Sequence, residues 1–431
     1  MILIDFFKKL KVTKSNFVKD ILILVGGTGF AQVISFLLTP VLTRIYSPKE
    51  YGILGLFTMV VLVLGILPTL QLQNIIIIEK VEDFAKKATG VTIIIASTIA
   101  FSLFLILLFT KEYLSTLLNI VEYENWLLLV PLLTWTNSIY LLLMSWANRR
   151  GNFKLMSVNR IILAIFVPVI SILLSYLTKN ATGLIIGYIL GNFLVTFLLI
   201  HFFIIREKLN FSFCVADIKE VLVKYKDFPK FSLPSAIINI FINQIPILML
   251  GKYSSTASVG HFNLSNRTLG MPIVLISSSF NEVFKQRATL EYNKHGKCDR
   301  IFLKSFFSLL IISILSFSVF ALYGSEIFTF VFGEQWRNAG KYSAIMVPLF
   351  IMRFSISPLT YLFVIANKQK DDLWGHIGML FFITLSFPIS YSLSEDTISM
   401  ITGYTISYCI VYLYYLVKSY HFSRGIKNAI L

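Results

Sequence analysis

Apolar runs of about 20 residues recur along this chain, and they constrain its fold more than any other feature. A helix of that length spans the roughly 30 Å hydrocarbon core of a bilayer, whereas a membrane β-strand needs only about ten residues of alternating polarity. Because lipid offers no hydrogen bonds to the backbone, spanning segments must be helices or closed barrels. Hydrophobic residues make up 56% and charged residues 14% of the chain. These features predict an all-α polytopic membrane protein.

The apolar runs predict twelve transmembrane helices. The first run follows a basic segment but is too long for a signal peptide, so it is interpreted as a retained span. The predicted spans cover residues 21–42, 51–72, 89–109, 126–146, 155–177, 182–205, 233–250, 257–282, 301–323, 342–363, 374–393 and 397–417.

Two short motifs recur six helices apart, which indicates two related halves of the same orientation around a central cavity. A turn and a glycine follow both the first and the seventh helix, and a Val-Pro-Leu run opens both the fourth and the tenth. The stretch 216–226 is predicted to form an amphipathic helix on the membrane surface. The predicted organisation is a basic N-terminus at 1–20, a six-helix lobe at 21–205, a linker at 206–232, a second six-helix lobe at 233–417 and a C-terminus at 418–431.

The basic residues indicate the orientation. The chain has 38 lysines and arginines and a formal charge of +16, which in a membrane protein is first a topology signal rather than a sign of nucleic-acid binding. The positive-inside rule therefore places both termini in the cytoplasm. Only seven basic residues fall in the loops of the other side: Arg44, Lys49, Lys111, Lys179, Lys252, Arg337 and Lys341.

Arg267 lies about ten residues inside the predicted eighth span, or about 15 Å from its start. A charge near the bilayer centre costs at least about 2.5 kcal/mol on insertion scales, so such a residue is expected to face a polar cavity. Arg353 is similarly deep, whereas Arg160 is close enough to a helix end to snorkel to the cytoplasmic surface. Further candidate substrate-binding residues within the spans are Asn263, Asn266, Asn239, Asn243 and Gln32.

The sequence offers no evidence of catalysis or of a cofactor. The carboxylate pairs fall in predicted loops, and Glu282 lies near the end of its span, so coupling through a buried carboxylate is disfavoured. A Gly-Thr-Gly motif at 27–29 lacks the rest of a phosphate-binding loop. Cys214, Cys298 and Cys409 have no metal-ligand spacing. We therefore expect no catalytic residue, metal or cofactor, and a transporter rather than an enzyme.

Several short motifs occur in a characteristic order along the chain. They are Pro40 with Arg44, Tyr46-Ser47-Pro48, Glu50-Tyr51-Gly52, Asn266-Arg267, Pro272, Asn281-Glu282-Val283-Phe284, Gln286-Arg287, Phe332-Gly333, Trp336, Ala339-Gly340, Pro358 and Asn367-Lys368-Gln369. The order of these motifs resembles the polysaccharide transporters of the multidrug, oligosaccharidyl-lipid and polysaccharide exporter superfamily, in particular O-antigen and capsular-repeat flippases. One departure is in the segment 70–76, where family members often carry a glutamate and an alanine.

The resemblance implies two six-helix lobes that alternate in access and move a polyprenyl-diphosphate-linked oligosaccharide to the outer leaflet of a bacterial inner membrane. Arg267 falls where related flippases of lipid-linked peptidoglycan precursors have a cavity arginine, so it is expected to bind the diphosphate or an acidic sugar. Arg353 is a second candidate for the anion, and the asparagines would contact sugar hydroxyls. Trp336 is expected to be an interfacial anchor.

Two alternatives remain open. A multidrug antiporter of the same superfamily would share the fold, but exporters of cationic drugs are expected to carry buried carboxylates. A membrane-embedded glycan polymerase or ligase would share the helix count, but such enzymes generally place catalytic residues in a large external loop. The expected partners are the lipid-linked oligosaccharide, membrane lipids, and a glycan polymerase with other proteins of lipopolysaccharide or capsule assembly, and not nucleic acid.

Overall fold

The computed structural model describes residues 16–178, 180–211, 215–273, 276, 278–366 and 368–425, with the backbone alone at 16–25, 278, 279 and 282. Several features named above lie outside the described part of the chain. They are the N-terminal segment up to residue 15, Lys179, Cys214, Asn367, the Glu282 side chain and residues 426–431.

Helices joined by short turns make up the described residues, among which there is no strand. Eleven of these helical segments are long and apolar enough to cross a membrane, which confirms the predicted all-α polytopic fold. Here η denotes a 3-10 or π-helix. The helices are α2 (Asn16–Ile45), α3 (Pro48–Gly65), η1 (Leu72–Asn74), α4 (Ile75–Ile78), α5 (Glu82–Leu117), η2 (Val121–Leu129), α6 (Val130–Arg149), α7 (Phe153–Ser175), α8 (Thr182–Ile200), η3 (His201–Arg206), α9 (Asp217–Lys224), η4 (Phe228–Ser232), α10 (Leu233–Tyr253), α11 (Thr256–Pro272), α12 (Ser278–His295), α13 (Asp299–Phe332), η6 (Glu334–Trp336), α14 (Arg337–Ile356), η7 (Ser357–Tyr361), α15 (Leu362–Ile365), α16 (Gln369–Ser394) and α17 (Thr397–Ser423).

The predicted eighth span differs most from its expected form. Its first part is α11, which has 17 residues and is not among the eleven candidate spans. Pro272 ends this helix, and α12 begins at Ser278. A proline has no backbone N–H to donate and its ring clashes with the preceding turn, so it commonly ends or bends a helix. The eleven candidate spans and α11 together agree with the twelve predicted helices.

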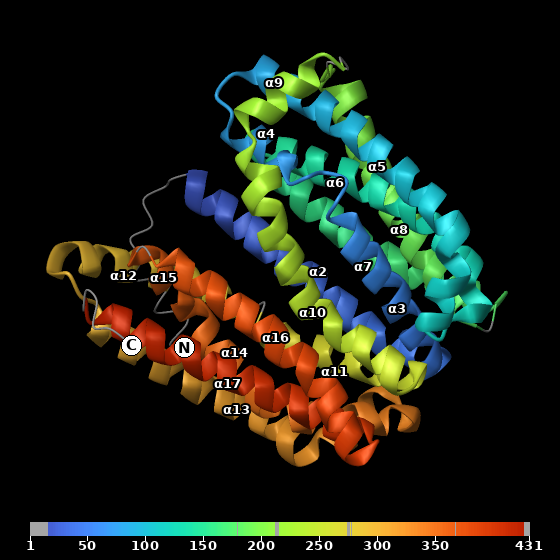
Figure 1. Cartoon of the computed structure of the whole chain (residues 1–431), viewed down its shortest axis with the longest axis vertical. Coiled ribbons are helices and arrows are strands. Elements are labelled where there is room, and N and C mark those ends of the chain that lie inside the picture. Colours follow the sequence, from blue (N-terminus) through green and yellow to red (C-terminus); the bar gives the residue numbers. More distant parts are fainter. Residues whose placement is uncertain are drawn as a thin grey trace.

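The helices form two groups that follow the order of the chain (Figure 1). The groups are joined where α3 packs against α10 and α11, and where α2 packs against α13. They diverge toward the end that carries α9 in one group and α12 in the other, which is called the α9 end below (Figure 1). The opposite end, with η6, is called the Trp336 end. The lobe boundaries at 21–205 and 233–417 remain predictions.

The joint between the groups is a close crossing of α3 and α11 at two glycines. A Cβ atom at Gly52 would collide with the carbonyl oxygen of Thr256, and a Cβ at Gly260 with the carbonyl oxygen of Pro48. The two helices therefore approach backbone to backbone, as small residues allow in membrane bundles. The contact is reciprocal, and its two glycines are those of the repeated turn-and-glycine motif.

Both helices at this joint begin with a side-chain cap. At the start of α3, Ser47 Oγ accepts from Glu50 N at 3.4 Å and Glu50 Oε2 accepts from Ser47 N at 2.6 Å, which forms a capping box. At the start of α11, Ser255 Oγ accepts from Ser258 N at 3.1 Å. These caps satisfy N–H groups that have no partner within the helix and so fix where each helix begins.

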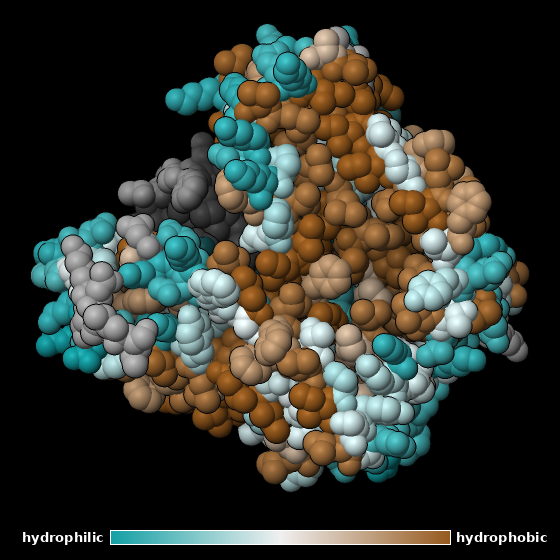
Figure 2. All heavy atoms as spheres, viewed as in Figure 1, coloured by the Kyte–Doolittle hydropathy of each residue, from teal (hydrophilic) through white to brown (hydrophobic). Residues whose placement is uncertain are grey.

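The surface agrees with a protein that crosses a membrane. Hydrophobic residues cover the middle of both groups of helices, and hydrophilic residues gather at the two ends (Figure 2). Large apolar side chains near the middle of the long helices are exposed, among them Phe101 of α5 at 63% and Leu315 of α13 at 68%. Contiguous apolar surface of this extent is unfavourable in water and favourable in lipid.

The predicted amphipathic linker helix is present as α9, and it docks on the first group of helices through a buried carboxylate. Glu79, which is 6% exposed, accepts from Lys224 Nζ at 2.5 Å and from the Tyr225 hydroxyl at 2.7 Å. The Lys224 ammonium also lies 3.7 Å from the ring centre of Phe84. The hydrogen bond from Lys224 is the largest cause that lowers the pKa of Glu79 from 4.5 to about 2.

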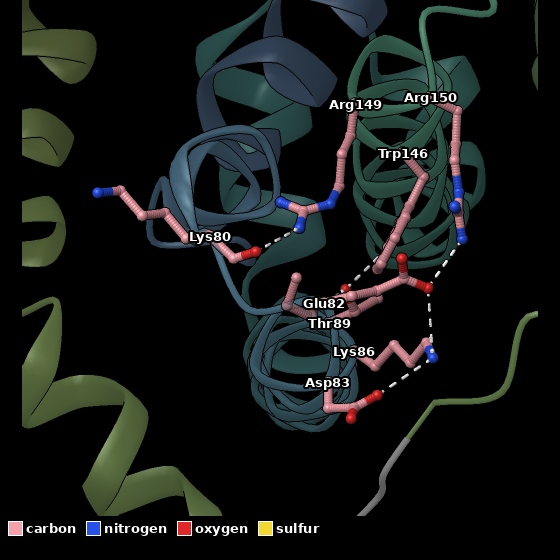
Figure 3. A network of polar contacts seen from close by, with 9 residues as sticks. Lys80, Glu82, Asp83, Lys86, Thr89, Trp146, Arg149 and Arg150 are labelled. Carbon is pink, nitrogen blue, oxygen red and sulfur yellow. Dashed lines mark hydrogen bonds and ion pairs between the residues drawn. The ribbon is translucent and has the colours of Figure 1, made fainter.

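A second set of polar contacts holds the start of α5 against the end of α6 (Figure 3). Arg150 Nη2 donates to Glu82 Oε1 at 2.8 Å, and Lys86 pairs with Glu82 at 3.3 Å. Arg149 donates to the carbonyl oxygens of Ile76, Glu79 and Lys80. These contacts fix the loop before α5. They thereby position Glu79 for its contacts with Lys224 and Tyr225.

The glycine crossing predicts an unequal effect of the same substitution along α11. Gly260→Ala should lower the free energy of unfolding by about 1–3 kcal/mol, because its new methyl group overpacks the backbone of α3. Gly270→Ala is the matched control, since a Cβ there meets no atom within 4 Å. Thermal unfolding of the purified protein in detergent measures both. Equal midpoints for the two variants would contradict the crossing.

The docking of α9 is predicted to depend on the Glu79 carboxylate. Because its folded pKa is lowered, the carboxylate stabilises docking above pH 4.5, and this contribution is lost as the pH falls from 4.5 toward 2. At pH 7, Glu79→Gln should reduce the protection of residues 217–224 against hydrogen exchange. Glu220→Gln is the control, because Lys87 keeps its 3.1 Å contact with Asp217. Unchanged protection in Glu79→Gln would refute this role.

Candidate functional site

A cavity of about 320 Å³ lies within the first group of helices and is bounded by Arg267 from the second. Residues of α2, α3, α7 and α8 form its other walls. Much of the lining is apolar, and the polar part consists of hydroxyl groups, one amide and two guanidinium groups. These polar residues are Thr28, Gln32, Ser35, Tyr51, Arg160, Ser171 and Arg267.

Arg267 reaches this cavity from the middle of α11. The residue is eleven positions after Thr256, which places it about 16 Å along the helix. Its side chain is exposed, and Nη2 donates a hydrogen bond to Ser35 Oγ on α2. A guanidinium has five N–H donors, so this bond leaves others for a ligand. The structure thus places Arg267 at a cavity, and its role in binding remains a prediction.

The polar face of α2 continues this surface. Thr28, Gln32 and Ser35 follow one another at spacings of four and three residues, which puts them on one face of the helix. Gln32 is exposed at the cavity. Of the predicted binding residues, the structure therefore brings Gln32 and Arg267 to the same cavity.

Arg160 also lines this cavity, which corrects the expectation that it snorkels to a membrane surface. It lies on α7, seven residues after the helix begins at Phe153. Its Nη1 donates to Thr28 Oγ1 at 2.6 Å, so the side chain points to α2. The signal available in the sequence was a charged residue, Arg160, two turns inside an apolar helix. The sequence could not show that Thr28 faces this residue.

The two arginines give the cavity its electrostatic character. Among the described residues that line it, there is no aspartate or glutamate. Cations held in a low-dielectric surrounding without a counter-charge favour the entry of an anion. Chemically, the site fits a ligand with anionic oxygens.

The two asparagines of α11 do not line this cavity. Asn263 packs against α3, where a Cβ at Gly55 would collide with its side-chain amide. Its Nδ2 is buried and has no hydrogen-bond partner among the described residues. Asn266, next to Arg267, is partly buried. Asn263 is therefore part of the joint between α3 and α11 in this conformation.

The two asparagines of α10 lie together at another exposed position. Asn243 Nδ2 donates to Asn239 Oδ1 at 3.1 Å and to the backbone carbonyl oxygen of Asn239 at 2.8 Å. Both side chains are exposed, and neither lines the cavity beside Arg267. The stacking expected from their spacing of four residues is present, and their role with a substrate remains a prediction.

Arg353 lies in the second group of helices, away from Arg267. It is on α14 and within electrostatic reach of the hydroxyls of Tyr404, Tyr408 and Tyr412, which form one stripe along α17. The ring centres of Tyr404 and Tyr408 are 5.0 Å apart. Arg353 therefore lies near the tyrosine stripe of α17 and does not line the cavity that Arg267 reaches.

Trp336 is buried between the two halves instead of anchoring the chain at a membrane interface, so that expectation was wrong. Its side chain is 0% exposed, and Nε1 donates to the carbonyl oxygen of Thr43 at 2.9 Å. Its ring meets Tyr51 edge to face at 5.1 Å between centres. Gln335 Nε2 donates to the same Thr43 carbonyl at 2.6 Å. These contacts join η6 of the second half to α2 and α3 of the first.

Comparisons with solved structures show a known transporter fold. A lipid II flippase MurJ in an inward closed conformation has a TM-score of 0.75 at 15% identity, covering 92% of this chain and 89% of the other. An inward-facing multidrug transporter of the MATE family and MOP superfamily has a TM-score of 0.69 at 14% identity, covering 90% and 93%. The chain therefore has the fold of these transporters.

Sequence comparison gives a relative and a family. The succinoglycan biosynthesis transport protein ExoT of Rhizobium meliloti (strain 1021) is 25% identical over 316 residues, which cover 71% of this chain. The chain matches only 60% of the length of that relative. A family model described as polysaccharide biosynthesis protein matches residues 41–341, which include most of the first half, α10, α11 and the η6 turn. The chain belongs to this family of polysaccharide biosynthesis proteins.

Proposed function

We propose that this chain is a flippase that moves a polyprenyl-diphosphate-linked oligosaccharide from the inner to the outer leaflet of a bacterial inner membrane. The observation that carries the proposal is the cavity with two arginines and, among its described lining residues, no acid. Family membership and the relative that transports during succinoglycan biosynthesis support a glycan substrate. An O-antigen, capsule or exopolysaccharide repeat is the finer form of this proposal.

The arrangement of the two groups of helices supports alternating access. Close contacts at the glycine crossing and at Trp336 join them at one end, and the groups diverge at the α9 end (Figure 1). The distribution of basic residues favours a cytoplasmic α9 end with both termini inside. In this orientation the substrate enters the cavity from the cytoplasmic side, and separation at the Trp336 end releases it outward while its lipid tail stays in the membrane.

Neither a multidrug antiporter nor a glycan polymerase or ligase fits the site as well as a flippase does. A multidrug antiporter shares the fold, but two arginines disfavour a cationic drug in this cavity. A polymerase or ligase needs acids, bases or nucleophiles placed at a reacting bond. The polar groups here are suited to hold anionic oxygens and hydroxyls instead, and they support transport without chemistry on the substrate.

Arg267 is predicted to be required for transport. In liposomes that contain a labelled polyprenyl-diphosphate-linked repeat, Arg267→Ala should lower the translocation rate about 10- to 100-fold, because a charge-assisted hydrogen bond contributes about 1.5–3 kcal/mol. Arg267→Lys should be intermediate, since it keeps the charge but loses the planar fork. Arg150→Ala, at the exposed α9 end, serves as the control. Normal translocation by stably folded Arg267→Ala would reject this role.

Trp336 is predicted to hold the Trp336 end closed. Trp336→Phe keeps an aromatic ring but removes the bond to Thr43, which should shift the equilibrium toward opening by about 1 kcal/mol, or about fivefold. The reporter is Gln32→Cys in a background without the three native cysteines, labelled by an impermeant maleimide in vesicles of each orientation. Labelling from the Trp336 side should rise in Trp336→Phe. No change would argue against a gate at this position.

A further inference from the structure

We propose that His261 is a proton-sensitive switch whose protonation opens the Trp336 end. His261 lies on α11 against the ring of Trp336, and the proposed binding of a lipid-linked glycan does not use it. The switch goes beyond the proposed function, and it does not depend on the identity of the substrate. Three features of the molecule support it: the surroundings of the imidazole ring, the contact between the halves beside it, and the contrast with a second histidine.

The imidazole of His261 is held between aromatic rings. It meets Trp336 of η6 and Tyr342 of α14 edge to face, with ring centres 5.6 and 5.9 Å away. His261 is 7% exposed, and its Nδ1 is buried without a hydrogen-bond partner among the described residues. Both nitrogens of a protonated imidazole are donors. Protonation in this conformation would therefore leave an N–H of a charged ring without an acceptor.

The polar groups beside His261 have other partners. The indole N–H of Trp336 donates to a backbone carbonyl of α2. The hydroxyl of Tyr342 shares hydrogen bonds with Ser258 and Thr397. Neither neighbouring side chain is therefore free to stabilise a charge on the imidazole.

No charged side chain of the described residues acts electrostatically on His261. Glu50 is bonded to the backbone at the start of α3, and Glu334 pairs with Arg337 at 2.8 Å. A proton on His261 would consequently have no carboxylate to pair with. The charged and titratable side chains at this end of the packed elements are Lys49, Glu50 and Tyr51 of α3, Lys252 and Tyr253 of α10, Glu334 of η6, Arg337, Lys341 and Tyr342 of α14, and Asp396 and Tyr404 at α17.

Protonation of His261 therefore opposes the contact between the halves. A buried charge without a partner is far less favourable than a solvated one, and attraction to an aromatic ring offsets only part of this cost, because a ring does not satisfy N–H donors. Trp336 contacts both the imidazole and, through its bond to Thr43, the first half. Movement of η6 away from α2 would break that bond and admit water to the imidazolium. Protonation and opening should thus favour each other.

His376 on α16 has the opposite surroundings. Its Nδ1 lies 2.9 Å from the backbone carbonyl oxygen of Asp372 and 3.6 Å from the Asp372 carboxylate. The Tyr415 hydroxyl is 3.0 Å from the same nitrogen. These oxygens can stabilise a protonated ring where it lies, so protonation of His376 requires no movement of helices. His376 is therefore the matched control for His261.

Distances across the Trp336 end, measured by pulsed electron paramagnetic resonance, test the switch. The full chain in lipid nanodiscs carries spin labels at the exposed sites Leu177→Cys and Ser394→Cys, in a background without the three native cysteines. A solvated histidine titrates near pH 6.5, so lowering the pH from about 7.5 to about 5.5 should raise the ratio of open to closed molecules about tenfold. In His261→Gln the ratio should change less than about twofold, because no proton is taken up at this position. His376→Gln should respond as the wild type does.

A tenfold response that persists in His261→Gln overturns the proposal. So does a wild-type distance distribution that stays constant with pH or that shifts toward closure in acid. Loss of the response in His376→Gln as well would attribute it to helix packing around either histidine and is equally contradictory. If His261→Gln does not fold, His261→Asn takes its place under the same criterion. The distances are measured without substrate, so a normal pH response in a protein that does not translocate the lipid-linked repeat supports the switch and rejects the proposed function alone.

Discussion

The contact of α3 with α11 at Gly52 and Gly260 is the constraint on which the arrangement of the two halves depends. Because each glycine faces a backbone carbonyl of the other helix, the halves approach as closely as two helices can. The capped starts of both helices lie beside this crossing, as does the buried ring of Trp336. The two halves are consequently in close contact at the Trp336 end, and the cavity lies beyond this contact.

The position of the two arginines offsets the free-energy cost of placing charged side chains in a membrane protein. Both guanidinium groups line a cavity, and each donates to a hydroxyl of α2. Hydroxyl partners orient a cation without neutralising it, whereas a carboxylate partner would cancel its charge. The cavity therefore keeps a net positive character that a ligand can use. This is the physical basis of the proposal that the cavity binds an anionic headgroup rather than a cationic drug.

The α9 end is held by different chemistry. Glu79 and its partners fasten the linker helix to the first half, and Arg149 and Arg150 hold the preceding loop (Figure 3). Here each cation has a carboxylate or a carbonyl partner, and the contacts stay within one half. The linker helix should therefore move with the first half, so that motion between the halves is taken up between α9 and α10.

The sequence by itself determined the all-α membrane fold and the number of helices, because the length and apolar character of a spanning helix are local properties of the chain. It also placed Arg267 well inside a helix. Tertiary structure decided which polar residues meet. It turned Arg160 toward Thr28, placed Asn263 against Gly55 instead of in the cavity, and buried Trp336 against Thr43. The direction of a side chain around a helix depends on neighbours distant in sequence, so an apolar run shows that a residue is in a span but not which cavity it reaches.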